Sequence, residues 1–309
     1  MSPRFLLLAL GAGAAAGCVP KVAERAPPPA DPAEVVQAIP APTPAPAPAP
    51  RAAPAGPSTF VYAGELTQGG WIRGQAPGGT VAARLGTEAL ALDSQGNFFA
   101  AFDRDAGPSA ELIATLDGGR EVRSPLTISP RDWQIERINA ARRPGGSTEA
   151  FDRLRQPELA RIAAARAVNA DADGWRQNFI WPLTGRISGR FGSQRIYRGE
   201  PAAYHSGLDI ATGGSGNPFV APAAGVVVLA AESPFTLEGN LLIIDHGQGL
   251  NSAFLHLSRI DVREGQRVEQ GQVLGTIGAT GRVTGPHLHW SIKWRETRLD
   301  PLLFLPPMP

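Results

Sequence analysis

A chain of 309 residues is long enough for about two domains together with additional segments. Its 29 basic and 28 acidic side chains nearly balance, so the composition gives no electrostatic footprint for binding nucleic acid. The chain contains one cysteine, Cys18, and an internal disulfide is therefore excluded. A nucleic-acid-binding protein and a disulfide-stabilised scaffold are the two classes that this composition excludes.

The first residues have the pattern of a secretory signal peptide. A short basic start precedes an uncharged apolar run that is too short to span a bilayer as a permanent helix. Small residues then lead to Cys18, where bacterial lipoprotein signals are cleaved and acylated, although Ala15 stands where leucine is usual. We expect residues 1–17 to direct export to the periplasm and Cys18 to carry a lipid anchor, with an ordinary cleaved signal as the alternative. Val19, instead of aspartate, favours the outer membrane.

Residues 18–58 read as a linker rich in proline and alanine, including the run Pro-Ala-Pro-Ala-Pro-Ala-Pro at 44–50. Such linkers adopt extended polyproline II at about 3.1 Å per residue, so this one can reach roughly 100 Å. From a membrane anchor it could present a following domain to a cell wall at a distance. A disordered spacer without a length requirement is the alternative.

Residues 59–130 predict a small β-sandwich-like domain, because short strands alternate with glycine-rich turns every eight to twelve residues. The expected strands are Phe60–Leu66, Gly70–Gly74, Thr80–Leu85, Glu88–Leu92, Asn97–Phe102, Glu111–Leu116 and Val122–Ile128. This region shows no catalytic pattern. It is either a module that binds the wall or covers a groove, or a spacer domain.

Residues 131–178 are expected to be a helical connector. Within them 147–168 have apolar residues at approximate helical spacing, and Ser147 or Thr148 can cap the start. Pro157 predicts either a kink or a second helix that begins there. We expect the helix to pack on one domain. An inhibitory segment that lies in a catalytic groove is the alternative.

Four of the five histidines stand in short motifs of the C-terminal region. His205 and Asp209 belong to the run His-Ser-Gly-Leu-Asp, and His287 and His289 belong to Gly-Pro-His-Leu-His-Trp. Side chains an even number of positions apart on a strand point to the same face, so each pair can line one surface of a sheet. Zinc takes imidazole and carboxylate ligands, and a catalytic zinc site has three of them and an open fourth position. These motifs therefore predict a zinc site on a sheet surface.

Together with Phe-Leu-His-Leu-Ser at 254–258, these motifs resemble the lysostaphin-type, or LytM-domain, zinc metalloendopeptidases, which cut peptide bridges of bacterial peptidoglycan. The resemblance implies a mainly β fold whose C-terminal domain, residues 179–305, is an antiparallel sheet with a groove. It implies one bound zinc ion with the ligands His205, Asp209 and His289. It also implies two catalytic histidines that do not bind the metal, His256 and His287, and either can be the base or the group that stabilises charge. His246, the remaining histidine, is expected to be structural.

The resemblance thus predicts a zinc metalloendopeptidase that hydrolyses peptide cross-links of peptidoglycan, in Gram-negative envelopes those between D-alanine and diaminopimelate. The expected partners are peptidoglycan, a membrane reached through the lipid anchor, and a regulatory protein. A non-catalytic activator of a separate cell-wall amidase is the alternative from another class. Activators of this kind tend to lose zinc ligands, and this chain has all three. A third hypothesis is that the N-terminal part holds the enzyme inactive until a partner displaces it.

Overall fold

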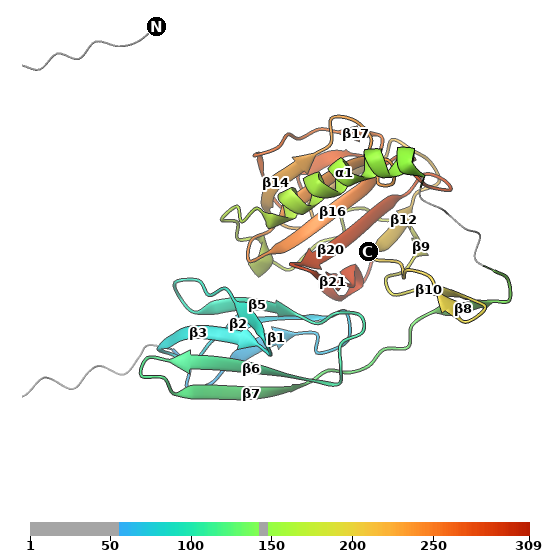
Figure 1. The fold of residues 1–309 in the computed structure, drawn as a ribbon. Coiled ribbons are helices and arrows are strands. Elements are labelled where there is room, and N and C mark those ends of the chain that lie inside the picture. Colours follow the sequence, from blue (N-terminus) through green and yellow to red (C-terminus); the bar gives the residue numbers. More distant parts are fainter. Residues whose placement is uncertain (1–55, 142–147) are drawn as a thin grey trace, which may run out of the picture. The chain divides into compact units, whose positions relative to one another are not determined.

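The computed structural model describes residues 56–141 and 148–309, and these residues belong to one compact unit. The predicted signal peptide, Cys18 and most of the predicted linker lie outside the described residues. Within the two described ranges, no helix is both long enough and apolar enough to cross a membrane. The described chain is mainly β, as predicted, with antiparallel sheets and one α-helix (Figure 1).

The first sheets form the predicted sandwich-like region, and all seven expected strands are present. Three of them pair in the order β1 (Val61–Gly64), β2 (Trp71–Gln75) and β5 (Asn97–Ala101). The other four pair in the order β4 (Glu88–Leu90), β3 (Thr80–Leu85), β6 (Ser109–Leu116) and β7 (Glu121–Thr127). Phe98 and Leu112 are fully buried, and the residues that follow them, Phe99 and Ile113, are buried as well, so β5 and β6 contribute consecutive side chains to the core.

The segment between the sandwich and the C-terminal sheet is only partly helical. Strand β8 (Ile135–Ile138) pairs in parallel with β10 (Gln194–Tyr197), which in turn pairs with β11 (Glu200–Pro201). Helix α1 (Glu149–Ala167) follows, and the Thr148 hydroxyl accepts a hydrogen bond from the Phe151 N–H as its N-cap. The helix is continuous through Pro157, so no second helix begins at that residue.

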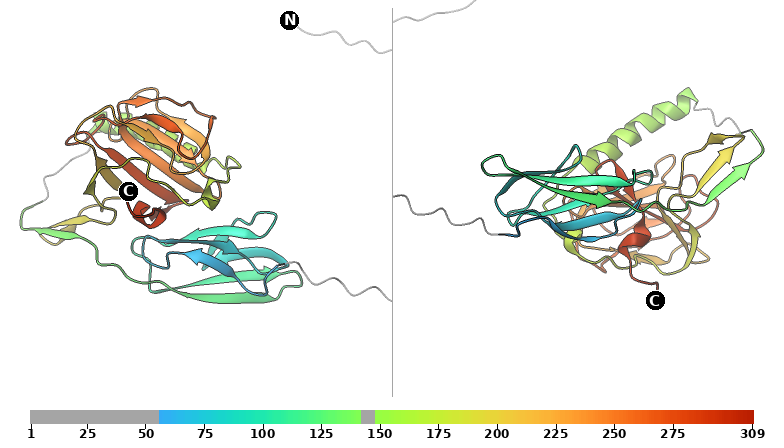
Figure 2. Two further views of the ribbon diagram at one scale, coloured as in Figure 1. Left: turned by 180° about the vertical axis from the view of Figure 1, so that it is seen from behind. Right: turned by 90° about the horizontal axis from the view of Figure 1, so that it is seen from below.

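The C-terminal region is built on an eight-stranded antiparallel sheet. Its main path runs β18 (Arg267–Val268), β14 (Gly225–Ala230), β15 (Asn240–Asp245), β16 (Leu250–Leu257), β20 (Leu288–Trp294), β12 (Leu208–Ala211) and β9 (Arg186–Gly189), and β21 (Thr297–Leu299) pairs with β20. A smaller sheet contains β13 (Pro218–Val220), β19 (Val273–Thr276) and β17 (Arg259–Ile260). Two 3-10 turns, Gly174–Arg176 and Pro301–Phe304, complete the elements (Figure 2).

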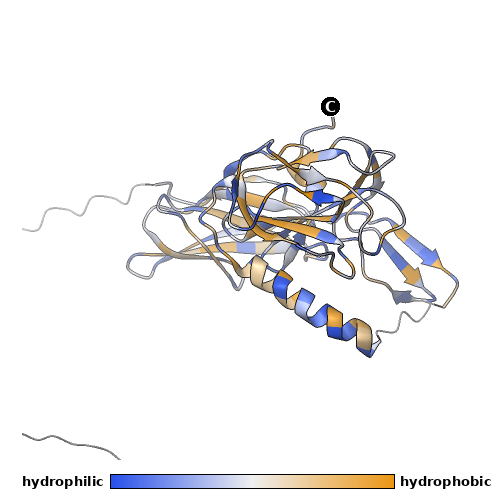
Figure 3. Ribbon diagram, turned by 90° about the horizontal axis from the view of Figure 1, so that it is seen from above, coloured by the Kyte–Doolittle hydropathy of each residue, from blue (hydrophilic) through white to orange (hydrophobic). Residues whose placement is uncertain are grey.

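The two faces of the large sheet differ in what they bury. On one face Phe254, Trp290 and Ile292 are completely buried in the core. The opposite face carries His289, and there helix α1 packs through Ile162 and Ala165 on Leu229, Leu241, Ile243 and Ala253. Figures 1 and 2 show the helix in front of the strands from one side and behind them from the other. The mixed hydropathy of α1 in Figure 3 fits a helix with one face on the sheet.

Candidate functional site

Two adjacent strands bring Asp209 and His289 together. The two residues are direct partners in the antiparallel pairing of β12 with β20, and the Asp209 Oδ1 atom lies 2.8 Å from His289 Nδ1. His205 lies before β12, not on a strand, and its Nε2 is 3.1 Å from Asp209 Oδ1 and 3.2 Å from His289 Nδ1. One potential ligand atom from each residue thus lies within 4.8 Å of the others. The structure therefore groups the three predicted ligands.

Glycine is required beside this cluster for steric reasons. A Cβ atom at Gly207 would lie 2.5 Å from the Trp290 carbonyl oxygen and 2.7 Å from His289 Nε2. At Gly189, on the other side, a Cβ would lie 2.3 Å from Asp209 Oδ2. All three distances are far below van der Waals contact, so any larger residue at Gly189 or Gly207 would displace a predicted ligand.

Hydrogen bonds orient the side chains of the cluster and shift their pKa values. The His205 Nδ1–H donates to the Arg190 carbonyl oxygen at 3.1 Å, which orients the ring so that Nε2 faces the cluster. Burial alone would raise the pKa of Asp209, but hydrogen bonds from His205 and His289 hold that pKa well below its usual range. Burial lowers the pKa of His289. The site thus presents a carboxylate and imidazole nitrogens, the donor set that zinc prefers.

His256 reaches the cluster through an irregularity in β16. Leu255 is the direct partner of His289, so regular alternation would turn His256 to the opposite face of the sheet. Instead, the pairing of β16 with β15 shifts register here, and His256 has a left-handed backbone with φ of 65°. Such a bulge redirects a side chain, and the His256 ring centroid lies 6.1 Å from that of His289.

Backbone contacts hold His256 in this uncommon conformation. Its N–H donates to the Glu238 carbonyl oxygen at 2.8 Å, and its Nδ1–H donates to the Thr280 carbonyl oxygen at 3.0 Å. The Nε2 atom is therefore the unprotonated nitrogen of the neutral ring. Burial lowers the pKa of His256 to about 4, so the ring is neutral at pH 7.

His287 lies one residue before β20 and faces the same cluster. Its Nδ1–H donates to the Gly285 carbonyl oxygen at 2.9 Å, and its Nε2 lies 3.6 Å from Asp209 Oδ1. The ring centroids of His256 and His287 are 5.1 Å apart. The structure thus brings all five predicted site residues together, with two further imidazole Nε2 atoms beside the three potential ligands.

Hollows adjoin the cluster on two sides. One, of about 1070 Å³, is lined by His289 and Ser206 together with residues of α1 and of the sheet face beneath the helix. The other, of about 1310 Å³, is lined by His205, Asp209 and Tyr204 together with residues of β8 and β10. The cluster therefore borders both hollows, through His289 on one side and through His205 and Asp209 on the other.

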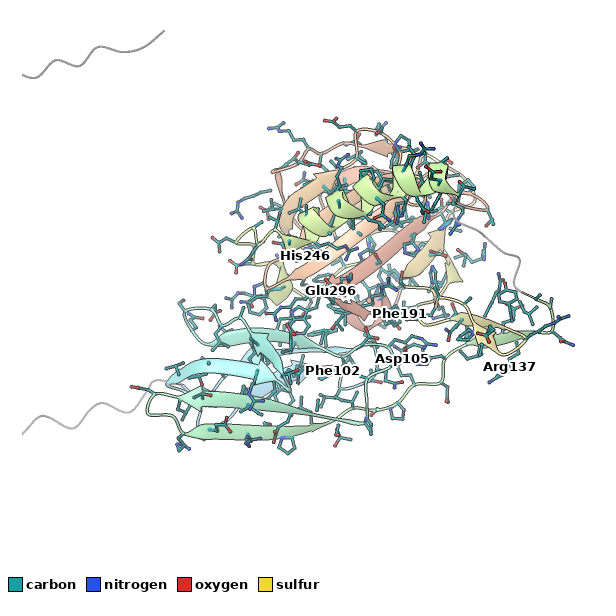
Figure 4. The ribbon with its side chains drawn as sticks, viewed as in Figure 1. Phe102, Asp105, Arg137, Phe191, His246 and Glu296 are labelled. Atoms are coloured by element: carbon teal, nitrogen blue, oxygen red, sulfur yellow. The ribbon has the colours of Figure 1, made fainter. Side chains whose placement is uncertain are left out.

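His246 is apart from this cluster and fully satisfied, as a structural histidine should be. Its Nδ1–H donates to the Ala224 carbonyl oxygen at 2.8 Å. The Trp290 Nε1–H donates to the Ser252 hydroxyl, which can then donate to His246 Nε2 at 2.8 Å. Burial lowers the pKa of His246 to about 4. Figure 4 labels this residue, which directly follows β15.

Sequence reasoning missed the residues that support the site. Gly189 and Gly207 make room for the cluster, and the carbonyl groups of Arg190 and Thr280 orient two imidazoles. The glycines stand inside the motifs Ile-Ser-Gly-Arg and His-Ser-Gly-Leu-Asp, so their position was a usable signal. The two backbone carbonyl groups left no signal in the sequence, because every residue has a carbonyl group.

Comparison with known proteins identifies the family of the C-terminal region. Residues 203–301 match Peptidase family M23. Peptidoglycan DD-endopeptidase ShyA of Vibrio cholerae is 42% identical over 108 residues, which are 35% of this chain and 24% of the relative. Murein hydrolase activator NlpD of Salmonella dublin is 34% identical over 144 residues, which are 47% of this chain and 34% of the relative. The chain spans about a quarter to a third of these two curated relatives.

A solved structure extends the similarity beyond the matched family segment. The crystal structure of a peptidase M23 from Pseudomonas aeruginosa superposes with a TM-score of 0.57 at 29% identity, and covers 77% of this chain and 94% of its own. The similarity therefore includes most of the described residues. Residues 203–301 of the chain form a Peptidase family M23 domain of the LytM type.

Proposed function

We propose that His205, Asp209 and His289 hold one zinc ion. Zinc–nitrogen distances of about 2.0–2.1 Å and tetrahedral angles place neighbouring ligand atoms about 3.3 Å apart. The three separations in the cluster, 2.8, 3.1 and 3.2 Å, are close to that spacing. Two imidazole nitrogens and a carboxylate oxygen that converge on one point also favour a shared cation. These residues fit a catalytic zinc site with one open position.

We propose that the domain is a zinc metalloendopeptidase. Zinc bound there would supply a Lewis acid that activates water and polarises a peptide carbonyl. His256 and His287 each hold the Nδ1–H in a bond to a backbone carbonyl, so each keeps Nε2 available to take or return a proton at the site. The observation that carries the proposal is this complete set of three ligands and two further imidazoles around one point.

We propose peptide cross-links of peptidoglycan, those between D-alanine and diaminopimelate, as the substrate. The M23 domain and the similarity to a DD-endopeptidase support this choice. The signal-like start and Cys18 favour a periplasmic protein anchored by lipid to the outer membrane, from which the proline-rich linker would reach the wall. Anchoring is tested by labelling with a fatty-acid analogue, which should be lost in Cys18→Ser.

Hydrolysis of purified cross-linked peptidoglycan by residues 52–309 tests the activity directly. With zinc we expect cross-linked muropeptide dimers to disappear, and with a chelator or in His289→Ala we expect them to persist. His246→Gln serves as the matched histidine control, because His246 lies outside the cluster. Cleavage that is equal in His289→Ala and in the wild-type protein would contradict the ligand assignment.

A second candidate function is activation of a separate cell-wall amidase. The similarity to a murein hydrolase activator over 47% of this chain favours it, as does the position of α1 along the cavity that His289 also lines. Adding the metal-free protein to a purified amidase and peptidoglycan distinguishes the two functions. The activator function is supported if the amidase releases more stem peptides when the protein is added, and if the protein without amidase leaves the cross-links intact.

A further inference from the structure

The cavity under helix α1 is lined by two arginines with different surroundings. Arg155 and Arg166 are eleven positions apart, about three turns, so they lie on nearly the same side of the helix, with Ile162 between them. At about 1.5 Å per residue their Cα atoms are about 16 Å apart along the helix axis. They therefore mark two ends of one cavity.

Arg155 is fully engaged within the protein. Its guanidinium donates to both carboxylate oxygens of Glu238, at 2.6 and 2.7 Å, and to Glu158 at 3.0 Å. Because the Glu238 carbonyl oxygen accepts the His256 N–H, this arginine lies at the end of the cavity near the metal site. A paired arginine of this kind anchors the helix and leaves little capacity to bind a ligand.

Arg166 lies in the last turn of the helix and is not engaged in this way. Its Nη1 atom is shielded from solvent and has no hydrogen-bond partner in the part of the chain that the structure describes. Burial lowers the pKa of Arg166 to about 10, so the side chain is still a cation at neutral pH. A buried guanidinium donor without an acceptor is costly unless a ligand satisfies it.

Further positive charge surrounds this end of the cavity. Lys293 and Arg298 are direct partners in the pairing of β20 with β21, and both line the cavity. Lys293 donates to Glu296 at 3.0 Å, but the Glu296 side chain is 99% exposed, in the turn between the two strands (Figure 4). Glu296 interacts with all three cations, but its single exposed carboxylate balances at most one of their three positive charges. Asp93 and Asp173 also line the cavity, but both are paired with Arg176, so Arg166, Lys293 and Arg298 together favour an anion.

We propose that this end of the cavity binds a carboxylate of the peptide substrate, with Arg166 as the specificity-determining residue. The inference rests on the proposed function, which makes the ligand a peptide whose anionic groups are carboxylates. Arginine suits such a group because its planar fork can donate two parallel hydrogen bonds to it. Lys293 adds a second donor when it exchanges Glu296 for the substrate.

The strand geometry places this carboxylate along the substrate. Lys293 is four residues from His289 on β20, which corresponds to about 14 Å at about 3.4 Å per residue. An extended peptide covers that distance in about four residues, and the long Arg166 side chain shortens it. The recognised carboxylate therefore lies three to four residues from the bond that is cut.

The test uses cross-linked stem-peptide dimers in which the carboxylates are amidated one at a time. With the zinc-loaded full chain, amidation three to four residues from the bond should lower kcat/KM about ten- to a hundredfold, as loss of charged hydrogen bonds does. Arg166→Gln should lower kcat/KM on the free dimer to the level of the amidated one. Arg153→Gln, an exposed arginine on the same helix, should keep the full preference.

Two results would overturn the inference: equal kcat/KM of the wild-type protein on all dimers, or an unchanged preference in Arg166→Gln. Thermal unfolding shows whether that variant is folded; if it is not, Lys293→Gln takes its place and should reduce the preference at least threefold.

If the zinc-loaded wild-type protein cleaves no dimer, the proposed function fails by itself. In that case calorimetry measures the binding of the same dimers to the metal-free chain and tests carboxylate recognition without hydrolysis. Equal affinity for free and amidated dimers rejects the inference.

Discussion

The sandwich-like region and the large C-terminal sheet are both antiparallel β-structures, but they bury different groups. Between residues 60 and 128 the buried residues are apolar except for Arg104. The C-terminal region buries Asp245, His246, Ser252 and His289 among other polar residues. Apolar area removed from water dominates the stability of the first region, whereas the polar groups buried in the second region also require hydrogen bonds. The difference teaches that the functional site lies in the region whose buried polar groups need a ligand, and not in the region whose interior is apolar.

The largest effect is expected at the metal cluster. Asp209→Asn removes the negative charge that faces His205 and His289, so we expect zinc affinity to fall and hydrolysis to slow at least about 1000-fold. The measurement is release of cleaved muropeptides together with zinc content after dialysis. Asp132→Asn, at an exposed aspartate, is the matched control. An Asp209→Asn variant with normal rate and zinc content would contradict the site.

Core truncation in the two regions should have similar costs but different consequences. Phe98→Ala and Trp290→Ala each remove a fully buried aromatic side chain and are expected to lower the free energy of unfolding by about 3–5 kcal/mol. Urea unfolding measures both. Since Trp290 directly follows His289 on β20, Trp290→Ala should also weaken zinc binding, and Phe98→Ala should not. Equal loss of zinc in the two variants would remove the contrast.

Acid should destabilise the C-terminal region through His246. The unfolded chain takes up a proton at this residue below about pH 6.5, whereas the folded chain resists until the pH nears the lowered pKa of about 4. The contribution to stability is therefore complete above pH 6.5 and is lost as the pH falls toward 4, by about 3 kcal/mol. Urea unfolding of the metal-free protein at pH 7 and pH 4.5 measures the loss, and His246→Gln should reduce it. An unchanged pH dependence in that variant would contradict this account.

The smallest effect is expected at the start of α1, the helix that covers the polar face of the sheet. Thr148→Ala removes the hydroxyl that accepts the Phe151 N–H, which should cost about 1 kcal/mol. Thermal unfolding measures it, and Thr148→Ser should restore most of the stability. A Thr148→Ala variant as stable as the wild-type protein would show that the cap does not hold the helix.

The sequence pattern was sufficient for much of the fold. All seven strands of the sandwich-like region were predicted, because alternating apolar residues and glycine-rich turns are local signals. The helix and its Thr148 cap were predicted for the same reason. Strand β8 was missed, since its parallel partner β10 lies more than fifty residues further along the chain and leaves no local mark.

For the site, the sequence by itself determined which residues offer the chemistry, because imidazoles and a carboxylate in short motifs are a property of residue type. Tertiary structure alone decided how they meet. Asp209 and His289 meet because β12 and β20 pair in one register, and His256 joins them because a bulge reverses its expected face. The position of Arg166 over the sheet likewise depends on the docking of α1. Strand register, bulges and helix docking arise from contacts between distant segments, which no local pattern encodes.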